Sequence, residues 1–109
     1  MSQVKFSLAE QCPDFAAELA GLLDESGEKA LAQTVPSLPV VDRCRGGDDF
    51  CATMYTAPHP HGAWGQGHRS IALHADTGDL ILAVVQDGIV AVEGLYREEL
   101  RERLLTLMP

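Results

Sequence analysis

The residues best suited to chemistry are four histidines within one short stretch of the sequence: His59, His61, His68 and His74. In an extended chain, residues two apart point to the same side, so His59 and His61 could hold one metal ion. Tetrahedral zinc needs further ligands, which His68 or His74, or a thiolate of Cys44 or Cys51, would supply. The incomplete ligand pattern favours the alternative, a proline-rich surface loop with solvated histidines.

The chain has three cysteines, Cys12, Cys44 and Cys51, and no Cys-x-x-Cys motif. An odd number without a leader sequence favours free thiols in a reducing cytoplasm. If residues 46–49 form the loop of a hairpin, Cys44 lies opposite Cys51, with Arg43 opposite Ala52 and Val41 opposite Met54. Such a pair would be close enough to oxidise, although we expect two thiols in the cytoplasm.

Trp64, the single tryptophan, lies in a segment rich in proline and glycine, residues 57–67. It either covers one end of the sheet or contacts a small molecule or a partner. Asp48 and Asp49 form a turn, where adjacent carboxylates usually point apart into water. The sequence has no nucleophile elbow and no glycine-rich phosphate loop between a strand and a helix, so we assign no catalytic and no cofactor-binding residue.

Helical periodicity occurs at both ends of the chain. Pro13 suits the first position of a helix whose apolar stripe is Phe15, Leu19, Leu22 and Leu23. A second short helix follows Ser26 and ends before Pro36. The last helix spans 97–108 and carries the stripe Leu100, Leu104, Leu107 and Met108. Residues 1–11 lack a clear period and predict an extended lead-in.

Between these helices the sequence predicts five strands, at 40–45, 50–56, 68–75, 80–86 and 89–96. Asp87-Gly88 predicts a type I′ hairpin. The 109 residues therefore predict a single domain, 1–109, of the α+β class: an antiparallel β-meander over residues 39–96, packed against N-terminal helices and one C-terminal helix.

Two segments resemble small bacterial domains of unknown function. In residues 78–95 the matching residues are Gly88, Ile89, Val90, Val92, Glu93 and Leu95; the second segment is Cys44–Tyr55. The resemblance implies a small bacterial domain and carries over no catalytic residue.

Charge gives the strongest indication of function. The chain has 16 acidic and 8 basic residues, a net charge of −8. This excess disfavours nucleic acids and anionic membranes, and the longest apolar run, residues 80–85, is too short to span a membrane. We expect a non-enzymatic binding protein of the bacterial cytoplasm with a basic protein partner, for which an immunity or antitoxin role would fit. The alternatives are the metal-binding protein and the small-molecule-binding domain described above. The segment 50–56 lacks charge and proline, so we also expect a homodimer that shares an edge strand or a sheet face.

Overall fold

The computed structural model describes residues 5–43, 52–58 and 65–108. Within them lie four α-helices and a 3-10 turn: α1 (Leu8–Gln11), α2 (Pro13–Glu25), α3 (Lys29–Thr34), η1 (Val35–Ser37) and α4 (Glu98–Leu107). The strands are β1 (Phe6–Ser7), β2 (Pro39–Val40), β3 (Asp42–Arg43), β4 (Met54–Tyr55), β5 (His68–Leu73), β6 (Asp79–Val85) and β7 (Gly88–Leu95). None of the helices in these ranges is long and apolar enough to cross a membrane.

The α+β class with an antiparallel sheet is confirmed. Five strands pair in the order β3-β4-β7-β6-β5, and β1 pairs with β2 in a separate small sheet. The predicted meander is correct for the pair β3–β4 and for β5, β6 and β7, but wrong where it makes β4 the neighbour of β5. β4 pairs with β7 instead, through Met54 opposite Val92. β7 buries side chains on both of its faces, Ala91 and Val92 among them, as expected of a strand that has a neighbouring strand on each side.

The predicted register of the first hairpin is also wrong. Arg43 lies opposite Met54 instead of Ala52, a shift of two residues. The prediction rested on turn composition alone, whereas the register is set by tertiary contacts: the Val41 N–H donates to the Tyr55 carbonyl at 2.8 Å, and β4 is held by β7. Cys44 and Cys51 lie outside the described residues, so their pairing stays a prediction. The hairpin register from which that pairing was predicted is not the one observed for Arg43.

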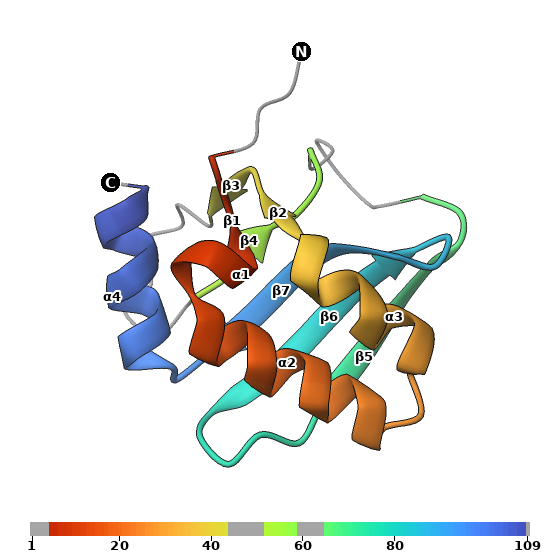
Figure 1. The fold of residues 1–109 in the computed structure, drawn as a ribbon. Coiled ribbons are helices and arrows are strands. Elements are labelled where there is room, and N and C mark those ends of the chain that lie inside the picture. The colour runs from red at the N-terminus through yellow and green to blue at the C-terminus, as the bar shows by residue number, and fades with distance from the viewer. Residues whose placement is uncertain (1–4, 44–51, 59–64, 109) are drawn as a thin grey trace.

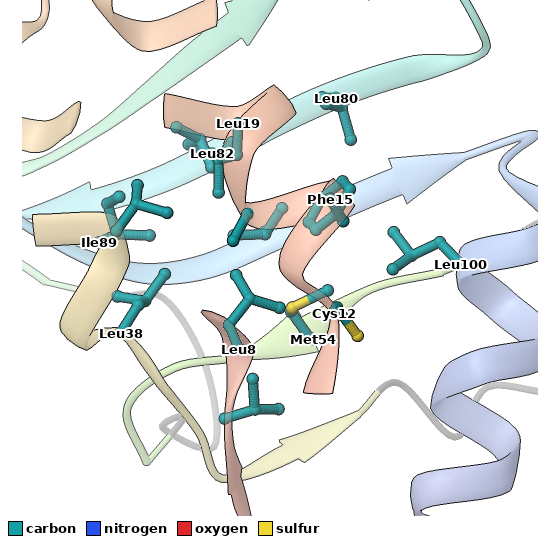
Figure 2. Close-up of a cluster of buried hydrophobic side chains, with 14 of the residues drawn as sticks. Leu8, Cys12, Phe15, Leu19, Leu38, Met54, Leu80, Leu82, Ile89 and Leu100 are labelled. Atoms are coloured by element: carbon teal, nitrogen blue, oxygen red, sulfur yellow. The ribbon is translucent and has the colours of Figure 1, made fainter. Parts of the chain in front are cut away.

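The helices α1, α2 and α3 lie together on one face of the sheet, and α4 lies beside it (Figure 1). Side chains of β6 alternate, and Leu80, Leu82 and Val84 face the helices. Leu19 and Leu23 of α2 are fully buried against this face, and Figure 2 shows Leu19 next to Leu82 in the core. The predicted stripes are largely confirmed, since only Leu22 and Leu107 among their members are half-buried instead of buried.

The predicted extended lead-in is only partly correct. Phe6–Ser7 is the short strand β1, but Leu8–Gln11 then forms a helix, and Leu8 is completely buried. One helical turn is too short for its periodicity to be recognised in a sequence. The sequence pattern therefore could not predict that Leu8 is buried.

The hairpin between β6 and β7 turns one residue earlier than predicted. Gln86 and Asp87 are the two loop residues, with φ of 50° and 66°, and Gly88 already pairs with Val85. Two positive φ angles are what a type I′ turn requires, so its type was predicted correctly. The ladder has an irregularity after Ala83, and the buried Thr56 hydroxyl donates to the Ile89 carbonyl nearby at 2.6 Å.

Candidate functional site

A cleft of about 770 Å³ lies between the N-terminal ends of α2 and α4. Its lining includes Phe15 from α2, Thr77 from the turn after β5, and Leu100 from α4. Figure 2 shows Leu100 pointing from α4 toward Phe15 and Cys12. Phe15 and Leu100 are buried, so the inner part of the cleft is apolar. A cavity of this volume with an apolar interior is within the range of ligand sites in proteins.

Arg97 connects the three segments that surround the cleft. It directly precedes α4, and its guanidinium donates two hydrogen bonds to the Glu18 carboxylate of α2, at 2.8 and 2.5 Å. The same group donates to the Thr77 carbonyl at 2.9 Å and lies 5.5 Å from the centre of the Phe15 ring. A planar guanidinium suits this set of contacts, because it can bond a carboxylate in two places and stack on an aromatic ring.

The Arg97 contact changes the ionisation of its partner. Hydrogen bonds from Arg97 hold the pKa of Glu18 below its usual value, against the opposing effect of burial. The pair is only partly exposed: the Arg97 side chain is 11% exposed and that of Glu18 32%. Arg97 is therefore a structural residue whose charge is balanced, and it is not available to a ligand as a free cation.

The backbone beside Arg97 is tightly constrained. Gly78 has a φ of +67°, and a Cβ there would lie 2.9 Å from the Tyr96 carbonyl oxygen and still closer to that of Leu95. Tyr96 itself has a φ of 58°, which is uncommon for a residue other than glycine. It is also 66% exposed, the one large hydrophobic residue exposed in the described part of the chain. The fold thus places an aromatic ring at the cleft with a strained backbone beneath it.

Cys12 lines the cleft next to Pro13, at the start of α2. The thiol is buried, and burial raises its pKa although Arg103 acts in the opposite direction. Arg103 also donates to the Gln11 carbonyl, at 3.0 and 3.3 Å. A buried thiol with a raised pKa is a poor nucleophile, so Cys12 contributes packing to the site.

The charge of the lining is mainly negative. Its carboxylates are Asp14, Glu18, Glu98 and Glu99, against the guanidinium groups of Arg97 and Arg103. Asp14, Glu98 and Glu99 are exposed and lie in the first turns of α2 and α4. Carboxylates there complement the helix dipoles, which accounts for their place in the fold. With Glu18 neutralised by Arg97, they leave the mouth of the cleft with three carboxylates against Arg103.

The site residues predicted from the sequence either lie away from the cleft or fall outside the residues that the structure describes. His59, His61 and Trp64 fall in 59–64, and Cys44 and Cys51 in 44–51, so these parts of the metal and Trp64 hypotheses stay predictions. His68 begins β5 and His74 directly follows it, and both are exposed. Six extended residues span about 20 Å, so the two imidazoles cannot bind one metal ion together. No group of three or more potential ligands occurs in ranges 5–43, 52–58 and 65–108.

Sequence reasoning missed the cleft because its residues come from three separate segments. Arg97 precedes a helix rich in charged residues, a pattern typical of a solvated face, yet its own side chain is paired and mostly buried. The one available signal is the acidic first turn of each helix, at Asp14 and Glu98-Glu99, and the helix dipoles alone are enough to explain it.

Comparison of the chain with protein-family models, with curated proteins and with solved structures finds no match.

Proposed function

We propose that this protein is a non-enzymatic binding protein of the bacterial cytoplasm, and that the α2–α4 cleft receives a basic segment of a partner protein. The observation that carries the proposal is the composition of the cleft. An apolar interior formed by Phe15 and Leu100 opens between exposed carboxylates, with the exposed ring of Tyr96 beside them.

This combination suits a lysine or arginine side chain. The aliphatic part of such a side chain gains from contact with apolar surface, and its charged end gains from nearby carboxylates. The ring of Tyr96 adds the option of a cation–π contact. The net charge of −8 acts over a longer range, since it attracts basic partners and speeds their association.

The test uses an oligolysine peptide as the probe, followed by ¹H–¹⁵N NMR of the whole protein. We expect the amide signals of Asp14, Tyr96 and Glu98 to shift first and to saturate together. An oligoglutamate peptide of equal length should shift none of them. Shifts spread evenly over the acidic surface would contradict the proposal, because they would indicate nonspecific attraction to the net charge.

Two double variants separate the cleft from the overall charge. Glu98→Gln with Glu99→Gln removes two carboxylates from the cleft, and we expect about tenfold weaker peptide binding. Glu25→Gln with Glu102→Gln is the control, because both residues are exposed on helices and neither lines the cleft. Both variants change the net charge by the same two units, so equal losses of affinity would overturn the proposed site. Thermal unfolding of each variant checks that α4 remains folded.

A further inference from the structure

The strand β5 forms one end of the five-stranded sheet. Its six residues pair with β6 from His68 opposite Val85 to Leu73 opposite Leu80, without a bulge. Of the strands in the described ranges, β6 is the one partner of β5. An end strand of this length presents a row of backbone donors and acceptors on its other side, which another strand can bind.

The hydrogen bonding of the β5–β6 ladder indicates which residues of β5 face outward. The Gln86 N–H donates to the Gly67 carbonyl, at 3.5 Å, directly before the strand. In antiparallel ladders the bonded residues alternate, so residues 69, 71 and 73 direct their backbone groups toward β6. The N–H and carbonyl groups of His68, Ser70 and Ala72 then point away from β6, and all three residues are exposed.

The sequence of β5 lacks the features that usually prevent edge pairing. It contains no proline and no bulge, and the outward residues Ser70 and Ala72 are small. Its one permanent charge, Arg69, is already paired with Glu28, at 3.1 and 3.2 Å. The edge therefore offers a flat strand whose charge is locally balanced.

We infer that two copies of this chain associate through β5, paired antiparallel about a two-fold axis at Ser70. This arrangement places Ser70 opposite Ser70 of the second copy, and His68 opposite Ala72. Each of these pairs lies at positions that exchange two hydrogen bonds. The interface is isologous, because one surface binds its own copy, and it joins the two sheets into one continuous sheet.

Charge explains why β5 is the favoured meeting point. Two copies that each carry −8 repel one another over most of their surfaces. At β5, the two-fold axis brings two Arg69 side chains and two Glu28 carboxylates to the same side of the sheet. Each Arg69 is balanced by Glu28 of its own copy, so the paired edges add no unbalanced like charge to this repulsion. The inference also corrects the expected edge: residues 54–55 form the interior strand β4, between β3 and β7.

Sedimentation velocity of the full chain, from about 1 µM to about 1 mM, measures the association directly. We expect the mass to rise from 11.7 kDa toward twice that value. Backbone amide exchange locates the interface: Ser70 and Ala72 should become more protected as the concentration rises, while Arg69 and Ile71 should not change. A monomer at every concentration, or protection that does not depend on concentration, would overturn the inference.

Two pairs of variants identify the strand. Ser70→Pro removes an outward N–H that the β5–β6 ladder does not use, and we expect loss of the dimer, whereas the control Ser70→Ala keeps it. Ala72→Lys places a charge at the edge and should weaken association at least tenfold, whereas Ala72→Ser should not. Ala72→Lys leaves the backbone unchanged, so it decides the question if Ser70→Pro fails to fold. Dimers that persist in Ala72→Lys would show that another surface is used.

Discussion

At the scale of single residues, the cleft depends on one glycine. Gly78 reverses the chain directly against the backbone of Leu95 and Tyr96, and its positive φ excludes most other residues. The close approach lets Thr77 present its carbonyl to Arg97. Even a single methyl group added at Gly78 would therefore disturb the turn, the start of α4 and the Glu18–Arg97 ion pair together.

We predict that Gly78→Ala lowers the free energy of unfolding by about 2 kcal/mol or more, because a Cβ meets two carbonyl oxygens and the φ is unfavourable. Urea unfolding measures this change. Gly21→Ala is the matched control: Gly21 lies in α2, is exposed, and has no atom within 4 Å of an added Cβ. There alanine should stabilise the protein by about 1 kcal/mol, since it favours helix more than glycine does. A similar loss in both variants would contradict the reasoning.

Unlike Gly78, Tyr96 adopts a backbone conformation that does not suit its residue type. Its φ of 58° costs free energy for a tyrosine, and its ring is largely exposed. Strain of this kind is more common where a side chain has a function. Substitution of Tyr96 can therefore distinguish an effect on stability from an effect on binding.

We predict that Tyr96→Asn leaves the free energy of unfolding unchanged or raises it, because asparagine tolerates positive φ. The same substitution should weaken oligolysine binding several-fold, because the aromatic ring is lost. Urea unfolding and the NMR titration measure the two effects on one protein sample. Lower stability with unchanged peptide affinity would show that the ring serves the fold instead of the ligand.

At the scale of elements, the Glu18–Arg97 pair joins α2 to the start of α4. The pKa of Glu18 is lowered in the folded protein, mainly by hydrogen bonds from Arg97. The unfolded chain then binds more protons than the folded one when the pH lies between the two pKa values. The stabilisation is present above the ordinary glutamate value, about 4.3, and is lost as the pH falls through the folded value.

We predict that Glu18→Gln lowers the free energy of unfolding at pH 7 by about 1 kcal/mol, a value kept small because Glu18 is partly exposed. The difference from the unsubstituted protein should shrink as the pH falls below about 4. Glu28→Gln provides the comparison, because its partner Arg69 is 46% exposed, against 11% for Arg97, and water therefore screens the Glu28–Arg69 pair better. Urea unfolding across this pH range measures both variants; equal effects would mean that burial of the Glu18 pair adds nothing.

The elements also show what the sequence could and could not predict. The start of α2 at Pro13 and its stripe of Phe15, Leu19 and Leu23 follow from local spacing, and so do β6 and β7. The pairing of β4 with β7 joins residues far apart in the chain, and no local period encodes it. The cleft is harder still, because it exists only once α2, the turn at Thr77 and α4 have met.

At the scale of the whole molecule, the net charge of −8 acts on both proposed associations, but in opposite directions. A basic peptide is attracted to the protein, whereas a second copy is repelled by it. Dissolved salt screens both effects, over a distance of about 10 Å at 0.1 M. Ionic strength therefore distinguishes the two associations without any substitution.

We predict that raising NaCl from about 20 mM to about 500 mM weakens oligolysine binding at least tenfold, because the attraction is screened. The same change should strengthen the β5 dimer, because the repulsion between two acidic copies is screened while backbone hydrogen bonds persist. NMR titration and sedimentation velocity measure the two constants in one set of buffers. The Ala72→Lys variant is the control for the first measurement, since it should bind the peptide with the same salt dependence as the unsubstituted chain. A dimer that weakens with salt would mean that ion pairs such as Arg69–Glu28, and not the strand backbone, hold the two copies together.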